Sequence, residues 1–321
     1  MRNGPFSLVA FVMLATASRS ARADGIDGEL ATTATLGLTD SLGWTGQDDG
    51  TKAAVGFAMR GILELERGAH TWDSRVDVEA AIGKARGAAE VAKARDGVSL
   101  ESVWRWRAVS WWGTFARVSL EASPLPSSLD HDSTTTHSIL ETDGRRQLVD
   151  ARSLGLTDPG APLRLRQDVG PVLLPVEVDP ARVAIHLGAA ARETFADGQL
   201  AVSDDPTTPF IDVEATESAM RAGMGGGVEV EGVISVARLR YRARIDLMTP
   251  FLYPERPGNE RGALNFTDVD LRAELSFRLV SWASLDYAFQ ALREPLVLND
   301  YRVRNALFLS VGPTVSFSSA H

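Results

Sequence analysis

The chain has 321 residues, of which 44% are hydrophobic and 23% charged, and this balance excludes a chain that is disordered by composition. Its formal net charge of -9 argues against nucleic-acid binding, which needs a basic surface. The absence of cysteine excludes disulfides, thiolate metal sites and cysteine nucleophiles.

The first 23 residues have the pattern of an export signal. Arg2 supplies a positive start, residues 6–17 form an apolar run, and Ala21-Arg22-Ala23 is a small-x-small cleavage site. A membrane-anchor helix is the alternative, but a spanning helix needs about 20 apolar residues. We therefore predict a signal peptide at 1–23 and a mature chain from Asp24, in which any membrane span consists of strands.

The remaining sequence is dominated by alternation of polar and apolar residues, which is typical of strands with two different faces. Residues 236–247 show it most clearly, and 72–83 and 268–279 repeat it. Applied along the chain, the pattern predicts twelve strands, at 29–39, 52–66, 70–84, 97–108, 110–122, 181–194, 198–204, 219–232, 235–249, 264–280, 282–293 and 301–317.

Short and long connections alternate between these strands. Arg67-Gly68-Ala69, Val109, Asp197-Gly198, Gly232-Val233 and Ser281 form the short ones, and 123–180 is the longest. Outer-membrane barrels have short periplasmic turns and longer external loops. We therefore predict an all-β fold for 24–321, a transmembrane antiparallel up-and-down β-barrel of about 12 strands. Its long loop at about 123–180 lies outside or folds into the lumen. Barrels of ten or fourteen strands are alternatives, because the pattern of residues 195–220 is ambiguous.

Tryptophan gathers beside the predicted short turns. Outer-membrane barrels carry girdles of aromatic residues at the membrane interfaces, so we predict such a girdle at one rim. It consists of Trp72, Trp104, Trp106, Trp111, Trp112 and Trp282. Ordinary core tryptophan is the alternative interpretation.

The last predicted strand carries a polar-x-Gly-x-x-apolar-x-aromatic pattern, formed by Ser310, Gly312, Val315 and Phe317. This resembles the C-terminal recognition signal of proteins inserted by the barrel-assembly machinery. Two features depart from that signal: four residues follow Phe317, and Pro313 removes a ladder donor.

Several motifs together resemble an uncharacterised family of bacterial outer-membrane barrels of unknown function, similar also to the salt-induced outer-membrane proteins. They are Gly43-Trp44, His70-Thr71-Trp72-Asp73, Ser99-Leu100-Glu101, Ile245-Asp246-Leu247 and the run 279–285. The middle of the chain, 123–234, matches poorly. The resemblance implies a fold and an outer-membrane location, and it transfers no catalytic or ligand-binding residue.

The polar faces of the predicted strands are rich in both signs of charge. An arginine ladder that favours anions is one interpretation, and a network of ion pairs that fills a narrow lumen is the other. Arg182, Arg192 and Asp286 share this face. The predicted lumen-lining residues are Arg60, Glu64, Asp73, Arg75, Asp77, Glu79, Glu101, Arg105, Arg107, Arg117, Arg238, Arg240, Arg242, Arg244, Asp268, Asp270, Arg272, Glu274, Arg278, Arg302 and Arg304.

Three further motifs lack the residues that their chemistry needs. Asp130-His131-Asp132 with His137 has no recognised metal-ligand spacing, so no metal is predicted. His186 is predicted to point inward, but no serine partner and no Gly-x-Ser-x-Gly elbow accompany it. The glycine-rich stretch 222–227 lacks the lysine and helix of a phosphate-binding loop. We predict no catalytic residue and no cofactor.

We therefore expect a non-enzymatic outer-membrane barrel, either a narrow channel or a structural barrel with a charged lumen. Its expected partners are outer-membrane lipid and, during insertion, the barrel-assembly machinery; the ligand is unknown. A membrane-embedded lipid hydrolase and a soluble periplasmic β-sandwich that binds a ligand are the alternatives.

Overall fold

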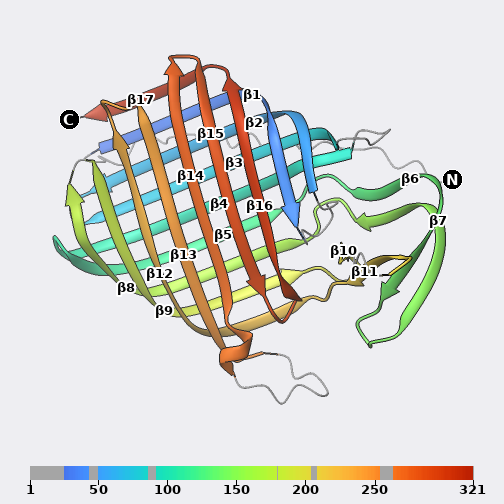
Figure 1. The fold of residues 1–321 in the computed structure, drawn as a ribbon. Coiled ribbons are helices and arrows are strands. Elements are labelled where there is room, and N and C mark those ends of the chain that lie inside the picture. The colour runs from blue at the N-terminus through green and yellow to red at the C-terminus, as the bar shows by residue number, and fades with distance from the viewer. Residues whose placement is uncertain are drawn as a thin grey trace, which may run out of the picture.

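A computed structural model describes residues 25–42, 50–85, 92–178, 180–203, 208–253 and 263–320 (Figure 1). The predicted signal peptide at 1–23 and the Gly43-Trp44 motif lie outside the described residues. The described chain is almost entirely β-strand, with one short 3₁₀ helix, η1 (Ala263–Phe266). No helix in this part of the chain has the length and apolar character needed to cross a membrane.

Most strands belong to one closed antiparallel barrel. Each strand pairs with its neighbours in the order β1-β2-β3-β4-β5-β8-β9-β12-β13-β14-β15-β16, and β16 pairs with β1 to close the ring. This ring excludes a two-sheet sandwich. The barrel strands are β1 (Gly25–Leu42), β2 (Gly50–Arg67), β3 (His70–Ala85), β4 (Ala92–Val109), β5 (Trp112–Ala122), β8 (Leu163–Val178), β9 (Ala181–Phe195), β12 (Ala219–Ile234), β13 (Leu239–Leu252), β14 (Asp268–Val280), β15 (Ala283–Glu294), β16 (Leu298–Val311) and β17 (Thr314–Ala320).

The twelfth strand of the barrel is interrupted. β16 pairs with the second half of β1, and β17 pairs with the first half of the same strand. Gly312 and Pro313 separate the two pieces, since proline has no N–H to donate to a ladder. Counted as one strand, β16 and β17 give the twelve-stranded antiparallel barrel that the sequence predicts.

The two ends of the barrel differ in their connections. At one end, turns of two to four residues join β2 to β3, β4 to β5, β12 to β13 and β14 to β15. Gly68 takes a positive φ of 55° in the first of these turns. The start of β1 lies at this end too, because Gly25 pairs with Glu66 beside the β2–β3 turn. We call this the short-turn end.

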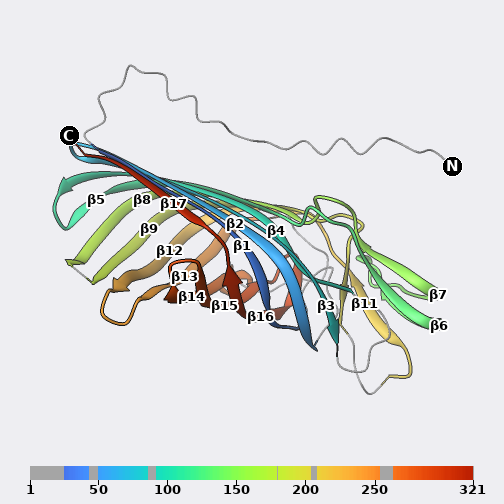
Figure 2. The ribbon, with the colours of Figure 1, turned by 90° about the horizontal axis from the view of Figure 1, so that it is seen from above.

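The opposite end carries a second, four-stranded sheet, which we call the external sheet. Its strands are β6 (Ser127–Leu140), β7 (Arg146–Thr157), β10 (Leu200–Val202) and β11 (Ile211–Ala215). Leu129, Leu156, Val202 and Val213 form its small core. Figure 2 shows β6, β7 and β11 projecting away from the barrel.

The prediction of a long loop at 123–180 is therefore wrong. It contains the β6–β7 hairpin and a complete barrel strand, β8. Pro171 and Pro175 hide this strand in the sequence, but they lie where the β8–β9 pairing is irregular, with a register shift between Leu173 and Val176. Bulges tolerate a residue without an N–H.

The predicted seventh strand, 198–204, is also not part of the barrel. Of its described residues, only Leu200–Val202 form a strand, and they belong to the external sheet. The Asp197-Gly198 turn consequently leads out of the barrel, while β8 ends at Val178 and β9 begins at Ala181, so the connection between them is the short one. The predicted number of barrel strands is right because the missed strand, β8, takes the place of the wrongly predicted strand at 198–204.

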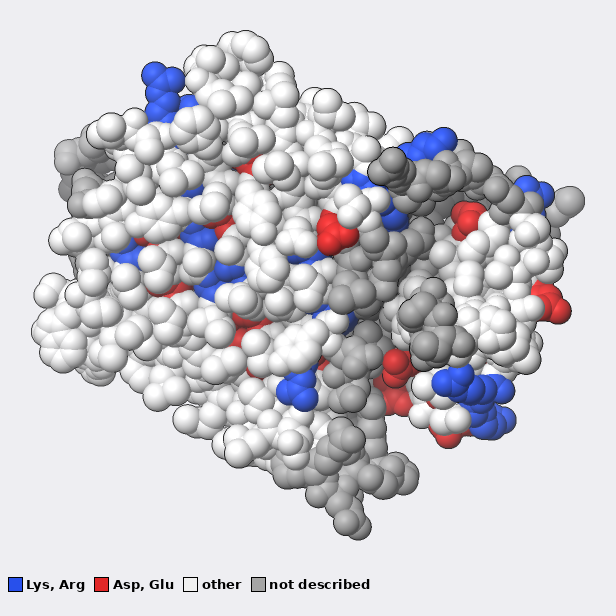
Figure 3. Space-filling view, viewed as in Figure 1, with Lys and Arg blue, Asp and Glu red and all other residues white. Residues whose placement is uncertain are grey.

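Side chains alternate across the barrel wall. On β13, Ile245 and Leu247 are 37% and 43% exposed on the outside, whereas Arg244 and Asp246 are buried inside. Figure 3 shows a wall that is mostly white, with charged atoms in narrow strips on it and larger charged patches at the end with the external sheet. The wall therefore presents an apolar outer surface and an ionic interior.

Candidate functional site

The lumen is the most strongly charged region of the described chain. Near the short-turn end it widens into a cavity of about 1800 Å³, which we call the vestibule; its lining reaches the turn residues Pro180, Ser235 and Ser281. Eleven carboxylates and eight guanidinium groups line it. This excess of carboxylates does not support the anion-favouring interpretation of the arginine ladder.

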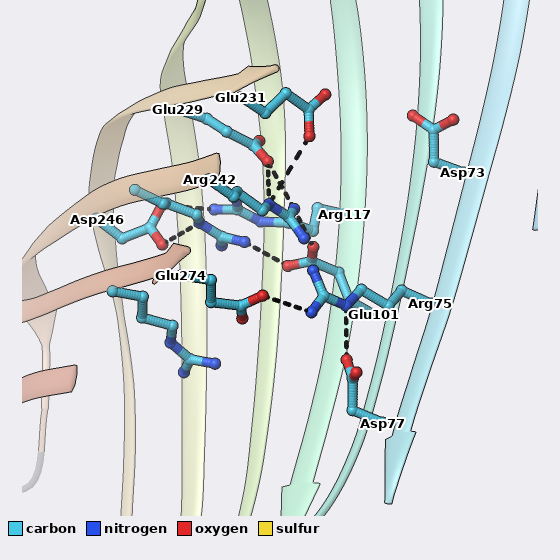
Figure 4. A network of polar contacts seen from close by, with 12 residues as sticks. Asp73, Arg75, Asp77, Glu101, Arg117, Glu229, Glu231, Arg242, Asp246 and Glu274 are labelled. Atoms are coloured by element: carbon cyan, nitrogen blue, oxygen red, sulfur yellow. Dashed lines mark hydrogen bonds and ion pairs between the residues drawn. The ribbon is translucent and has the colours of Figure 1, made fainter. Parts of the chain in front are cut away.

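Ion pairs cross the lumen between strands that are far apart in the ring (Figure 4). Arg75 on β3 donates to Glu274 on β14 at 2.8 Å, and Arg242 on β13 donates to Glu101 on β4 at 3.1 Å. Glu101 also accepts from Arg244. Because these side chains meet from opposite walls, they narrow the passage beyond the vestibule.

Further from the short turns, the charges become fully buried and form what we call the ion-pair belt. Arg117 on β5 contacts Asp168 at 2.7 Å and Asp246 at 3.0 Å. Glu294 on β15 contacts Arg221 at 2.7 Å and Arg164 at 3.2 Å. The belt consists of Arg117, Arg164, Arg166, Asp168, Arg221, Arg244, Asp246, Asp268, Asp270, Glu294 and Arg302, none more than 9% exposed.

An apolar cluster lies next to the belt along the chain, toward the end with the external sheet. Ala219, Phe266, Leu296 and Val297 are buried together, with Tyr253 packed against them. Ala219, Phe266 and Leu296 lie two residues along the chain from the belt residues Arg221, Asp268 and Glu294, respectively. Buried charges are tolerated when they are paired, and the belt residues lie against partners of opposite charge.

The structure brings most of the predicted lumen residues into these networks. Pairs formed within the predicted set include Arg60 with Asp77, Arg105 with Asp73, Arg304 with Glu79 and Arg272 with Asp270. Glu64 and Arg278 line the vestibule. Arg302 contacts Glu294, Arg240 contacts Glu29, and Arg107 contacts Glu66.

One predicted lumen residue differs in its local structure. Arg238 lies in the β12–β13 turn with a positive φ of 51°, so the strand begins at Leu239 and not at 235. Its guanidinium donates to the carbonyl of Leu279. Arg238 is thus at the mouth of the vestibule and not on the ladder of β13.

Sequence reasoning missed the contribution of β8. Arg164, Arg166 and Asp168 alternate with Leu163, Leu165 and the polar Gln167, and Val169 resumes the apolar phase. Apart from Gln167, this is the signal that predicted the other strands. Arg166 contacts Asp270 in the belt. The prolines that follow these residues directed the interpretation toward a loop.

His186 lies inside the barrel as predicted, with 4% of its surface exposed. Its ring meets the Phe115 ring edge-on, with centroids 4.6 Å apart. The void beside it is lined by Arg117, Asp168, Arg192, Asp246 and small or apolar residues, and no serine is among the described residues that line it. The structure therefore shows no nucleophile against this imidazole.

The predicted loop motif with two histidines lies on β6 of the external sheet. The rings of His131 and His137 are 5.2 Å apart, and Asp130 accepts from Ser128 at 2.8 Å. Burial lowers the pKa of His137, and the charge of His131 adds to the effect. Among described residues, no group of three or more His, Asp or Glu is arranged to hold a metal.

The six tryptophans predicted as a girdle all lie at or near the short-turn end. Each is between 36% and 60% exposed, and Trp72 and Trp104 are direct partners on β3 and β4. Trp111 and Trp282 occupy the β4–β5 and β14–β15 turns. Five of the six lie on the neighbouring strands β3, β4 and β5 or in the turn between β4 and β5. Exposed indoles at one rim are what a membrane interface favours.

The predicted insertion signal spans the break between β16 and β17. Ser310 points inward and is 6% exposed, whereas Val315 and Phe317 are 62% and 56% exposed on the outside. A Cβ at Gly28 would lie 2.1 Å from the Phe317 ring, so glycine provides the space for this aromatic ring. The described chain therefore presents the apolar residues of the motif to the exterior.

Comparisons with known proteins assign no family. No family model matches the chain, and no curated protein matches it. Solved structures with a similar course of the chain include the translocator domain of the autotransporter NalP from Neisseria meningitidis, at 10% identity and a TM-score of 0.37, covering 92% of this chain and 90% of that one.

Two further structures are similar at the same level. The β domain of the Bordetella autotransporter BrkA has 9% identity and a TM-score of 0.34, covering 88% of this chain and 98% of that one. The Pseudomonas putida toluene transporter TodX has 9% identity and a TM-score of 0.35, covering 93% and 90%. Similarity at this level does not indicate a function for this chain. The chain's own geometry, with an apolar outside, an ionic inside and short turns at one end, is that of an outer-membrane β-barrel.

Proposed function

We propose that this protein is a bacterial outer-membrane barrel whose lumen is closed by the ion-pair belt, so that it acts as a structural barrel and not as an open pore. The observation that carries the proposal is the set of buried ion pairs between distant walls. Arg117 reaches Asp246 across the lumen, and Arg164 reaches Glu294, with all four side chains at most 9% exposed.

The length of the wall strands and their apolar outer surface support the proposed location in the outer membrane. Strands of 11 to 18 residues on the uninterrupted part of the barrel reach or exceed the 9–11 residues that a tilted strand needs to cross a bilayer. Exposed leucine, isoleucine and phenylalanine cover the outside, including Leu36, Ile82 and Phe277. Large apolar surfaces of this kind are unfavourable in water and favourable against acyl chains.

A narrow channel is the second candidate, because the vestibule provides about 1800 Å³ of space with charged walls on one side of the belt. Such a channel would need the belt to rearrange. Its selectivity would depend on the side chains left in the opening and not on the arginines of β13 alone.

Planar-bilayer recording of the purified, refolded protein tests the proposal. We expect no discrete conductance steps from the wild-type barrel. Replacing both members of one belt pair, Arg166→Ser with Asp270→Ser, leaves the charge balance unchanged and opens space, so steps are expected. The matched control is the exposed pair in the external sheet, Arg145→Ser with Asp143→Ser.

The outcomes separate the candidates. Small, uniform steps from the wild-type protein that grow in the belt variant support the narrow channel. Large steps from the wild-type protein, unchanged in the belt variant, contradict both candidates because the belt would then not occlude the lumen.

A further inference from the structure

The mouth of the vestibule carries negative charge on one side. Asp27 on β1 is the direct register partner of Glu64 on β2, and Glu64 is the partner of Asp73 on β3. All three line the vestibule, and we call them the acidic sector. Direct partners on neighbouring strands have Cβ atoms about 4.5–5.5 Å apart, and like charges in such pairs are unfavourable.

A different side of the mouth carries positive charge. Arg240 is on β13, Arg278 is on β14, and Arg238 lies in the turn before β13, where its carbonyl accepts from the Arg278 N–H at 2.9 Å. These arginines also line the vestibule, and we call them the basic sector. Three strands separate β13 from β1 around the ring, so the two sectors lie apart across the lumen.

One ion pair bridges the two sectors. Arg240 Nη1 and Nη2 donate to the two carboxylate oxygens of Glu29 on β1 at 3.3 and 3.2 Å. Asp27 precedes Glu29 on β1, and Arg278 follows Ser276, the register partner of Arg240, on β14. Asp27 and Arg278 are therefore one row nearer to the short turns than the bridge, which forms the floor of a site at the mouth.

The acidic sector has more negative charge than its direct partners balance. Asp73 is bound to Arg105, whereas Asp27 and Glu64 form no direct ion pair among the described residues. The main charged groups that act on Glu64 from a greater distance are three carboxylates and the guanidinium of Arg182. This side of the mouth therefore favours a cationic group.

The basic sector offers donors in the same row. Arg278 forms no direct ion pair in the part of the chain that the structure describes, and Arg238 donates to the carbonyl of Leu279. Asp286 on the neighbouring β15 already accepts from two serine hydroxyls, at 2.5 and 2.8 Å. This side of the mouth therefore favours a carboxylate, which guanidinium groups bind through charge-assisted hydrogen bonds.

We propose that the mouth of the vestibule binds a short peptide in its zwitterionic form. Its terminal ammonium lies toward Asp27 and Glu64, and its terminal carboxylate lies toward Arg238 and Arg278. A simple cation would satisfy only the acidic sector, and a simple anion only the basic sector. Because two side chains alone span the gap at the bridge, a peptide that adds about 3.3–3.6 Å per residue reaches both sectors with a few residues.

This site goes beyond the closed-lumen proposal and does not depend on it. The mouth lies outside the ion-pair belt, so peptide binding and conductance are separate measurements, and the failure of one proposal leaves the other standing.

Calorimetric titration of the detergent-solubilised barrel with trialanine tests the site. The wild-type protein should bind trialanine about tenfold more tightly than its N-acetyl or its C-amide form, because each blocked end loses a charge-assisted hydrogen bond. Binding should weaken as salt is added, since the charges at the mouth are partly exposed.

Variants of the two sectors should change the preference for each peptide end separately. Asp27→Asn with Glu64→Gln should bind trialanine and its N-acetyl form equally. Arg238→Gln with Arg278→Gln should bind trialanine and its C-amide form equally. The matched control is the exposed pair of the external sheet, Asp143→Asn with Arg145→Gln, which should keep both preferences. Heat-modifiable gel mobility checks that each variant is folded, and either sector variant alone suffices for the test.

Three results would overturn the proposal. The first is no detectable binding of trialanine by the wild-type protein, and the second is equal binding of all three peptides. The third is tighter binding of the C-amide form than of trialanine, which would assign the mouth to simple cations.

Discussion

Removing the carboxylate of Glu294 is the most informative test of the ion-pair belt. The side chain is 3% exposed and contacts Arg164, Arg221 and Arg302. Glu294→Gln keeps the shape and removes the charge. Arg221 keeps Asp268 at 2.6 Å, whereas Arg164 has no other ion pair among the described residues. Breaking a buried pair by removing one partner costs about 3–5 kcal/mol, because the other charge stays buried.

The assay is the free energy of unfolding from urea titrations of the protein refolded into lipid vesicles. Asp143→Asn provides the matched control, since Asp143 and Arg145 form an ion pair of 2.5 Å with side chains that are 49% and 82% exposed. Exposed pairs contribute little to stability, so we expect almost no change from this control. A loss below about 1 kcal/mol for Glu294→Gln would show that the belt is hydrated and would contradict the closed lumen that we propose.

Three further predictions concern regions away from the belt. Burial lowers the pKa of His137, so the unfolded state binds the proton of this imidazole more tightly than the folded state. The external sheet should therefore have its full stability above the unfolded pKa of about 6.5 and lose stability at lower pH. Amide exchange in β6 should be faster at pH 5 than at pH 7.5, and this difference should be absent in His137→Gln. Phe317→Ala should lower the fraction of heat-modifiable, membrane-inserted protein in cells, because it removes the outward aromatic of the insertion signal, whereas Ser316→Ala should not. Trp111 fluorescence should be quenched more by lipids brominated near the headgroup than by lipids brominated at the chain ends, as interfacial tryptophan requires; the opposite order would place this rim elsewhere.

The barrel was predictable because its wall repeats one strong local pattern. Alternation of charged and apolar residues on β3, β13 and β14 fixes which face is inside, since a shift of one residue would move every charge to the lipid side. The register pairs confirm this, with Arg242 opposite Glu274 and Ile245 opposite Leu271.

The errors arose where local signals conflict with tertiary structure. Pro171 and Pro175 made β8 look like a loop, although irregular pairing accommodates them. The strands of the external sheet carry polar residues on both faces, so β6 and β7 have no clear period.

The sequence also did not predict which charged side chains form ion pairs with one another in the lumen. The phase of each strand predicts that Arg75 and Glu274 point inward, but not that they meet across the barrel. That contact depends on how far opposite walls approach one another, which alternation along a single strand does not encode.

The central claim is that apolar residues of the wall face lipid and charged residues face an enclosed interior. The chain has no cysteine, so single cysteines carrying an environment-sensitive dye test it directly in vesicles with a lipid-phase quencher. Dyes at Ile245 and Leu275 should be strongly quenched, and dyes at Arg242 and Ser276 should be protected. Quenching at Arg242 and Ser276 with protection at Ile245 and Leu275 would contradict the account.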